Sequence, residues 1–540
     1  MNSRTPKLRA AYAAWVACAL FFFTGRAFVP HLGVQNDEAL FAAAVYPPHG
    51  GIYIVQLGHS KYPLMLMSYL GTLKSWIYRP VFRWFGTSVS ALRDPMLLAG
   101  TATVWLFYLL LRSISGERAG IIGCSLLAVD SLYLLTICFD WGPVALQHLL
   151  LVSAILLLFR FYQTHRTPAL AGGFYLMGLA MWDKAIALWL LGGIFVAGIG
   201  IFPRPILRVT GFWRVLTAVL AFALGSLPLI VYNVDNHWET FRNHRYELNA
   251  LSSKAELLAG TADASAMFGW LVDENWKTPV PHQPKGWIQS AAVKISALAG
   301  HPRRNLMLYA FALALLLAPL ARGHELRAIL FALIAMVVGW LQMAITVNAG
   351  GSVHHAILLW PLPEMAIGVS LAAASRRLGR AGIPAVTAVT GVLVVSSLLV
   401  TNEYFKMMNR NGGGMNWTNA IFGLSDYLKG VQATGVYSMD WGIMDSLRLL
   451  NRGKLPLEIG FDQIGKPAIS PEERSLVHQM IGTPEHVFVA HTADFQFFKG
   501  YSEKLLTFAA EAGYQRQMMA VISDAYGRQV YEVYRFARAP

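Results

Sequence analysis

Two adjacent acids, Asp37 and Glu38, follow the first long apolar run of the chain. A carboxylate at the edge of a membrane loses part of its hydration, which raises its pKa and suits it to act as a general base toward a hydroxyl group. Acids at helix boundaries are also ordinary capping residues. Taken alone the pair favours a structural role, so its catalytic role depends on what else reaches the same membrane face.

Two lysines lie at comparable positions. Lys61 precedes an apolar stretch, and Lys184 stands next to Asp183 after another apolar run. A cation at the membrane surface can bind a lipid phosphate. Lysines also extend into the headgroups from membrane edges without any binding role, and Asp183 and Lys184 can pair with each other. Both lysines are therefore candidate phosphate-binding residues with a structural alternative.

Asp140 lies in a short polar turn between two apolar runs, in the sequence Phe-Asp-Trp-Gly-Pro. Asp140 and Asp37 form the pair of acids that would support a divalent metal or position an acceptor. Alternatively, Asp140 caps the helix that begins at Pro143. We expect no cofactor to be required and keep a divalent metal as the alternative.

Two adjacent histidines, His354 and His355, follow a glycine-containing run from 348 to 353. The glycines permit close backbone approach to a ligand. Adjacent residues point in different directions on a helix, so the two imidazoles do not easily bind one metal ion. We expect one histidine to face a phosphate or a sugar.

The composition indicates a membrane protein. Of 540 residues, 55% are hydrophobic and only 14% are charged, and the mean hydropathy is +0.45. The net charge of +14 comes from short basic clusters between apolar runs, a pattern of cytoplasmic loops and not of a nucleic-acid surface. The three cysteines fall in or beside apolar segments without zinc-binding spacing.

The apolar runs predict about eleven transmembrane helices, since a span needs roughly 20 apolar residues. The first follows a basic start and shows no cleavage site, so we expect an uncleaved membrane helix. The predicted spans are 10–30, 94–112, 118–137, 143–162, 168–182, 185–202, 212–233, 303–320, 327–347, 355–374 and 383–401.

The charges of the short connections predict the orientation. With a cytoplasmic N-terminus, every short cytoplasmic connection is basic, and the opposite connections carry almost no Lys or Arg. The long segments 31–93, 234–302 and 403–540 then lie outside. The first has the composition of an interfacial helix, the second that of a polar lid. The third alternates strand-like and helix-like runs, as in a small α/β domain beyond a membrane module of residues 1–402.

All of these candidates face outward, and in this arrangement the chain resembles the C-type glycosyltransferases, in particular the aminoarabinose transferase and protein O-mannosyltransferase branch. The family's acidic pair resembles Asp37-Glu38, and its lysine motif in the first loop resembles Lys61-Tyr62-Pro63-Leu64. Further motifs resemble Asp140, Asp183-Lys184 and the helix start at His354, where His replaces the usual Tyr. The resemblance spans about residues 10–400.

The resemblance implies an inverting sugar transfer from a polyprenyl-phosphate donor to a lipid, glycan or protein acceptor outside the plasma membrane, the inner membrane of a bacterium. It implies that Asp37 or Glu38 is the base and that Lys61, Lys184 and one of His354 or His355 contact the donor phosphate. The resemblance implies no nucleic-acid partner. Its membrane partners are the surrounding lipids.

Two other classes of protein have many apolar helices. A transporter or flippase would show inverted repeats or broken helices near mid-bilayer, and neither is visible in the sequence. A non-catalytic scaffold with an external binding domain would not depend on the outward acids. The resemblance favours the transferase over both.

Overall fold

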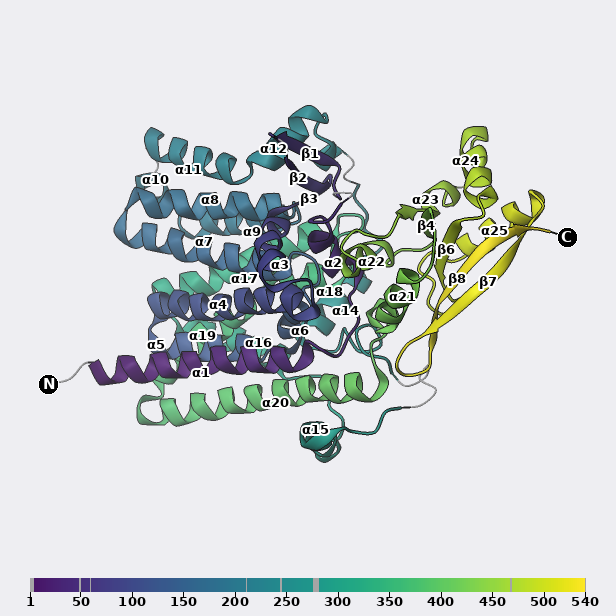
Figure 1. Cartoon of the computed structure of the whole chain (residues 1–540). Helices are drawn as coiled ribbons and strands as arrows, with labels where there is room; N and C mark the ends of the chain where they lie inside the picture. The colour runs from purple at the N-terminus through teal and green to yellow at the C-terminus, as the bar shows by residue number, and fades with distance from the viewer. Residues whose placement is uncertain are drawn as a thin grey trace.

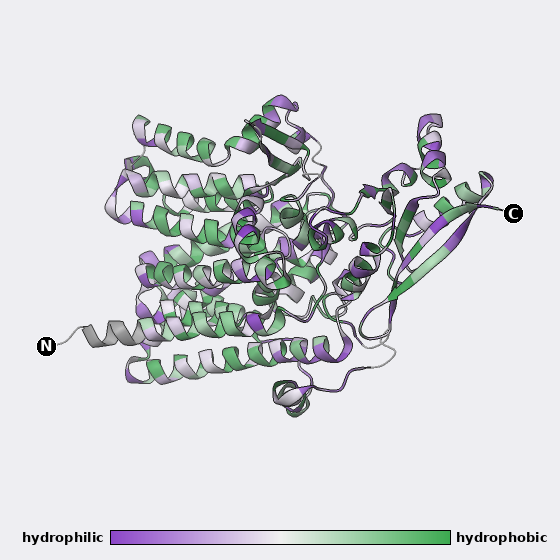
Figure 2. Ribbon diagram, in the orientation of Figure 1, coloured by the Kyte–Doolittle hydropathy of each residue, from purple (hydrophilic) through white to green (hydrophobic). Residues whose placement is uncertain are grey.

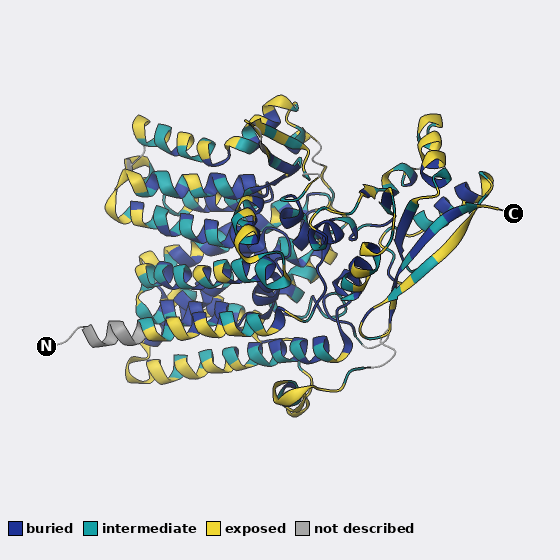
Figure 3. Ribbon diagram, in the orientation of Figure 1, coloured by how far each residue is buried: buried dark blue, intermediate teal, exposed yellow. Residues whose placement is uncertain are grey.

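The computed structural model describes residues 4–47, 50–58, 60–209, 211–242, 245–274, 281–466 and 469–539. Its helices run side by side as a bundle, and a sheet-containing segment lies beyond one end of that bundle (Figure 1). Many large apolar side chains are exposed on the outer helices, among them Phe195, Leu316 and Val392 (Figures 2 and 3). A bundle with an apolar outer surface is suited to lipid.

Six helical segments are long and apolar enough to cross a membrane by length and composition. Two bent pairs raise the number to eight in the described residues: α5 (Glu117–Val129) with α6 (Ser131–Cys138), bent by 60°, and α11 (Phe212–Gly225) with α12 (Leu227–Asp235), bent by 74°. The six contain α1 (Arg4–Phe28), α4 (Val89–Ser115), α7 (Val144–Thr164), α17 (His324–Ala344), α18 (Val353–Ala356) with η2 (Ile357–Leu359) and α19 (Leu362–Arg377), and η3 (Gly379–Ala381) with α20 (Gly382–Asn411).

The expected number of eleven spans is not confirmed. The remaining three predicted runs form shorter helices. Two of these are α9 (Ala187–Ile201), with 15 residues, and α8 (Thr167–Asp183), with 17. At about 1.5 Å per residue, a helix of this length is shorter than the ~30 Å apolar core of a bilayer. The third of these shorter helices is α16 (Met307–Leu317), which is extended by η1 (Ala318–Leu320).

The segment between α1 and α4, which the sequence predicts to be external, contains a small sheet and an amphipathic helix. After α2 (Asn36–Ala43), the strands β1 (Tyr53–Leu57), β2 (Ser60–Met67) and β3 (Leu70–Gly71) pair antiparallel in that order. The expected interfacial helix is α3 (Leu73–Phe85), with Trp84 and Phe85 exposed and Tyr78 buried. The sheet was not predicted from the sequence.

The segment between α12 and α16, which the sequence also predicts to be external, is partly helical. It contains α13 (Glu239–Arg242), α14 (Leu251–Ala262) and α15 (Gly286–Leu298), while α10 (Pro203–Val209) lies in an earlier connection. The predicted proline-rich stretch 278–284 falls partly outside the described residues.

The carboxyl-terminal segment, residues 420–539, contains a five-stranded sheet of order β5-β4-β6-β8-β7. Strand β4 pairs parallel with β5 and β6, whereas β8 pairs antiparallel with β6 and β7. The strands are β4 (Gly435–Ser438), β5 (Leu457–Ile459), β6 (His486–His491), β7 (Tyr514–Ser523) and β8 (Gln529–Arg538). The helices are α21 (Ala420–Lys429), α22 (Met444–Leu450), α23 (Phe461–Ile464), α24 (Pro471–Gly482) and α25 (Tyr501–Glu511), after the turn η4 (Met415–Trp417).

A buried ion pair between Arg93 and Glu38 joins the outer end of α1 to the start of α2. Arg93 Nη2 donates to Glu38 Oε2 at 2.8 Å and to the Gly33 carbonyl at 2.7 Å, and Nη1 donates to the Val29 carbonyl at 2.6 Å. Both charged side chains are completely buried. The guanidinium on α4 therefore fixes the path of residues 29–38.

We expect Arg93→Met to destabilise the protein by about 3–5 kcal/mol, because it leaves the Glu38 carboxylate buried without a partner. Thermal unfolding of the purified protein in detergent measures this loss. The double variant Arg93→Met/Glu38→Gln should recover part of it.

The matched control is Arg474→Gln, which removes an ion pair with Glu511 whose two side chains are about half exposed. It should cost less than about 1 kcal/mol. An Arg93→Met variant as stable as this control would contradict the structural role of Arg93.

Candidate active site

Five charged residues gather where helices end at the outer face of the bundle, and we call them the charged cluster. They come from the first turns of α2 and α3, the α6–α7 turn and the α8–α9 turn. The charged cluster consists of Asp37, Lys74, Asp140, Asp183 and Lys184.

Asp37 is half-buried in the first turn of α2. The Gln35 side chain accepts a hydrogen bond from the Asp37 backbone N–H at 2.7 Å, and Trp141 Nε1 donates to Asp37 Oδ2 at 3.2 Å. Burial raises the pKa of the Asp37 carboxyl group, while the charge of Lys184 opposes the increase. A carboxylate oriented in this way and with a raised pKa is suited to accept a proton.

Glu38 has a different environment from its neighbour. It completes the capping box of α2 with Gln35 and forms the buried ion pair with Arg93. Both of its oxygens contact Arg93 nitrogens. The structure therefore gives Glu38 a positioning role, and of the two candidate bases only Asp37 lies in the charged cluster.

Asp140 is completely buried and has a left-handed backbone conformation with φ of 45°. Lys74 Nζ donates to Asp140 Oδ1 at 2.6 Å, and Tyr78 OH donates to Oδ2 at 2.6 Å. Lys74 Nζ also donates to the Gly142 carbonyl at 2.6 Å. The ion pair fixes the α6–α7 turn against α3.

These contacts do not fit a metal site shared by Asp37 and Asp140. Both Asp140 oxygens already accept hydrogen bonds from protein groups. Within the described ranges, no three His, Cys, Asp or Glu side chains are grouped so that they could hold a metal ion. The pairing expected from the sequence is thus replaced by an ion pair with Lys74.

Lys184 is buried beside strand β3, and its backbone pairs with Leu70. The next residue is also tied to this segment, since the Ala185 N–H donates to the Tyr69 carbonyl at 2.9 Å. No hydrogen bond or ion pair of Lys184 Nζ occurs among the described residues. Burial lowers the pKa of Lys184 to about 8, although Asp37 and Asp183 oppose the decrease. This ammonium group is available to an anionic ligand.

Asp183 is the second unpaired group of the charged cluster. Its side chain is completely buried, and neither carboxylate oxygen has a hydrogen-bond partner. Leaving a buried carboxylate unsatisfied costs free energy. Its position beside Lys184 is consistent with hydrogen bonds to a bound ligand.

His354 packs against Trp141, the residue that donates a hydrogen bond to Asp37. Its ring centroid is 4.8 Å from the Trp141 ring and 4.2 Å from the His355 ring, and Ser352 Oγ is 2.7 Å from its Nδ1. His355 Nδ1 is buried without a partner. His354 therefore contacts Trp141, and His355 contacts His354.

Lys61 is not brought into the charged cluster. It is exposed on β2 opposite Gln56, near the turn of the β1–β2 hairpin. Strand β3, which pairs with Lys184, adjoins the opposite end of β2 from Lys61. Because a strand advances about 3.3 Å per residue, the several residues between them keep Lys61 away from Lys184.

Lys74 and Trp141 are the site residues that the sequence analysis did not single out. Lys74, Tyr78 and Phe82 are spaced four residues apart and are all buried on one face of α3. A lysine on the apolar face of an amphipathic helix indicates a buried acid partner. That spacing would have identified Lys74.

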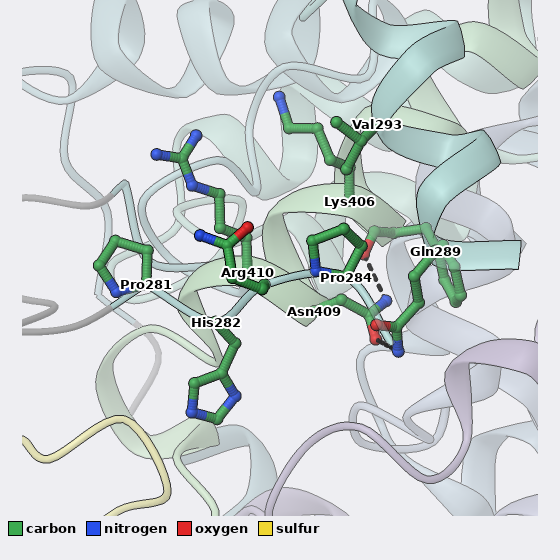
Figure 4. A pocket seen from close by; sticks show the side chains of 10 residues that line it. Pro281, His282, Pro284, Gln289, Val293, Lys406, Asn409 and Arg410 are labelled. Carbon is green, nitrogen blue, oxygen red and sulfur yellow. Dashed lines mark hydrogen bonds between the residues drawn. The ribbon is translucent and has the colours of Figure 1, made fainter. Parts of the chain in front are cut away.

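A groove of about 330 Å³ lies outside the charged cluster (Figure 4). It is formed by residues 281–284, by Gln289 and Val293 of α15, and by the end of α20, including Arg410. It shares no lining residue with the charged cluster, so we assign it no part in the chemistry described here.

Gly71 allows β3 to approach the α8–α9 turn. A Cβ atom at this position would overlap the carbonyl oxygen of Trp182. We expect Gly71→Ala to destabilise the protein by about 1–3 kcal/mol through overpacking. Thermal unfolding measures this, with Gly200→Ala as the control, because no atom lies within 4 Å of a Cβ at Gly200. Equal stability of the two variants would show that β3 does not need this close approach.

Residues 71–230 match the family model for dolichyl-phosphate-mannose-protein mannosyltransferases. This range includes Lys74, Asp140, Asp183 and Lys184, but not Asp37 or His354. A search of curated proteins gives no match.

A solved structure with a TM-score above 0.5 shows the similarity of the fold. The structure of ArnT from Cupriavidus metallidurans, bound to undecaprenyl phosphate, aligns with a TM-score of 0.58 and 13% identity, covering 98% of each chain. The Archaeoglobus fulgidus oligosaccharyltransferase aligns with a TM-score of 0.49 and 12% identity, covering 96% of this chain and 70% of that one. The predicted resemblance is thereby confirmed: this membrane protein has the fold of the C-type glycosyltransferases, of the aminoarabinose transferase and protein O-mannosyltransferase type.

Proposed function

We propose that the protein transfers a sugar from a polyprenyl-phosphate donor to an acceptor hydroxyl group at the outer membrane face, with inversion and with Asp37 as the base. The observation that carries this proposal is that Asp37, oriented by Trp141, lies near the unpaired ammonium group of Lys184. A base and a phosphate-binding cation are the two groups that such a transfer needs.

In the proposed reaction, Asp37 accepts the proton of the acceptor hydroxyl group as its oxygen attacks the anomeric carbon. The bond between that carbon and the phosphate oxygen breaks, and the polyprenyl phosphate leaves with the bonding electrons. Attack from the face opposite the phosphate inverts the anomeric configuration. Asp37 then loses its proton to water.

Lys184 stabilises the negative charge on the departing phosphate. A fixed charge in a site with little water stabilises a developing charge more strongly than it would in water. His354 is the second candidate for the phosphate, since its ring adjoins Trp141. The unpaired Asp183 oxygens are suited to accept hydrogen bonds from sugar hydroxyl groups.

The donor class is supported by the similar structure of ArnT, which is bound to undecaprenyl phosphate. We propose no step through a metal ion, because both Asp140 oxygens already accept hydrogen bonds, one from Lys74 and one from Tyr78. Alternate short connections are basic, and basic connections usually lie in the cytoplasm. This pattern supports a cytoplasmic N-terminus in the plasma membrane. It also supports an extracytoplasmic location for the proposed carboxyl-terminal domain, residues 403–540.

The charged cluster also distinguishes the transferase from a transporter. Its residues lie at the ends of α2, α3, α6 and α8 and in the turns between spans. Transporter sites typically lie near the bilayer midplane between broken helices. The chain has two bent pairs, α5–α6 and α11–α12, but the charged cluster lies at helix ends and not at these bends. A cluster at one face is better suited to a lipid-linked donor whose phosphate lies in the headgroup region.

We expect Asp37→Asn to lower the transfer rate by about 10²–10⁴-fold, because the amide cannot accept the proton. The measurement is mass spectrometry of glycolipids and glycoproteins in a deletion strain complemented with each variant. The exposed Asp426→Asn serves as the control. If the Asp37→Asn strain makes the wild-type products at the wild-type rate, Asp37 is not the base.

Lys184→Met should weaken binding of undecaprenyl phosphate by roughly 10–100-fold, the value of a hydrogen bond to a charged group. Binding to the purified protein in nanodiscs measures this, and Lys61→Ala is compared in parallel. Lys61 remains a predicted phosphate ligand from the sequence. A large loss in Lys61→Ala with none in Lys184→Met would assign the phosphate to Lys61 instead.

The rate as a function of pH should be bell-shaped. The acidic limb rises as Asp37 loses its proton, at a pH above the ordinary range for an aspartate because burial raises its pKa. The basic limb falls as Lys184 loses its charge near pH 8 in the free protein. The ratio kcat/KM measures this profile, and Lys184→Arg should shift the basic limb to higher pH. An unshifted basic limb would show that Lys184 is not the group that titrates there.

A further inference from the structure

Helix α15 has the reverse of the usual polarity of a surface helix. In a water-soluble protein, such a helix packs its apolar side inward and exposes its polar side. The inward side of α15 instead carries Gln289, Ala292 and Ser296, and its outward side carries large apolar residues. This arrangement indicates that the outer surroundings of α15 are not water.

The inward side of α15 binds α20 through polar contacts. Gln289 Nε2 donates to Asn409 Oδ1 at 2.6 Å, and Asn402 Nδ2 donates to the Ala292 carbonyl at 2.9 Å. Ser296 hydrogen-bonds to Glu403, and Lys406 Nζ donates to Ser296 Oγ at 3.1 Å. The helix thus covers the buried ion pair of Glu403 with Lys406.

The outward side of α15 forms an apolar stripe, made of Trp287, Ile288, Ile295 and Leu298. At 100° per residue, these four positions fall within about 100° of one another and opposite Gln289. Trp287 is 80% exposed and Leu298 is 89% exposed. Exposed groups of this size in one stripe mark an interaction surface.

The position of α15 identifies the medium that covers the stripe. In Figure 1, α15 is seen nearly end-on beside the outer half of α20, whose axis runs across the page, so α15 lies across the direction of the spans. Glu403 and Lys406 lie eleven residues, about three turns, beyond the exposed Val392 and Val395 on the same face of α20. Helix α15 therefore begins where the lipid-facing surface of α20 ends.

We propose that α15 lies in the outer membrane interface and buries its apolar stripe among the lipids of that leaflet. Two exposed lysines can interact with anionic headgroups, Lys285 at the N-terminal end of the helix and Lys294 beside the stripe. The helix shields the Glu403–Lys406 pair from the lipid and anchors segment 281–304 at the level of the headgroups. This inference does not depend on the proposed transferase activity.

Spin-label accessibility of the full-length protein in phospholipid nanodiscs tests the proposal. The buried Cys18, Cys124 and Cys138 are replaced by alanine, and single labels are attached at Leu298→Cys and Ile288→Cys. Two matched controls are exposed apolar positions: Val392→Cys on the span α20 and Leu476→Cys on α24 of the carboxyl-terminal segment.

We expect the ratio of oxygen collisions to nickel-chelate collisions at 298 and 288 to approach that at 392 and to exceed that at 476 severalfold. Oxygen concentrates in lipid, whereas the nickel chelate stays in water. A ratio equal to that at 476 would overturn the proposal. So would dipolar broadening between the α15 labels of two molecules, since that result would show that a second copy of the chain covers the stripe.

Discussion

The outer face of the bundle depends on the ion pair between Arg93 and Glu38. The guanidinium binds three carbonyls after α1, those of Val29, Leu32 and Gly33, and both oxygens of Glu38, and both charged side chains are completely buried. A buried pair of charges tolerates little displacement, because each charge loses its charged partner when the other moves. The position of Asp37 follows directly, since it is the neighbour of Glu38 in the first turn of α2.

The carboxyl-terminal segment supports the same region from the other side. Helix α22 packs on α2, and Ser446 Oγ donates to the Val34 carbonyl at 2.9 Å. Asp445 on α22 is close enough to Asp37 for their charges to interact unfavourably. The segment thus contributes to the surroundings of Asp37, and the residues that hold Asp37 in place come from positions more than 400 apart in the sequence.

The sequence indicated the membrane class, because apolar runs are local signals. Asp37, Asp140 and Lys184 lie in one charged cluster and His354 contacts Trp141, while the side of the membrane that they face stays a prediction. The partners of these residues were not predictable in the same way. Glu38 and Asp140 pair with Arg93 and Lys74 through contacts between distant segments, and Lys61 lies on a hairpin that its apolar composition did not reveal. Counting apolar runs gave eleven because it included runs that form helices of only 15 and 17 residues, α9 and α8.

The balance of charge in the cluster links donor binding to the strength of the base. Three carboxylates share the cluster with two ammonium groups, and Lys74 is already bound to Asp140. On the proposed mechanism, the phosphate of a donor adds negative charge to a region where Lys184 is the unpaired one of the two lysines. Its arrival draws Lys184 away from Asp37 and raises the pKa of that carboxyl group further. On the proposed mechanism, Asp37 thus becomes a stronger base when the donor is in place, and it is a weaker one when the site holds only the acceptor.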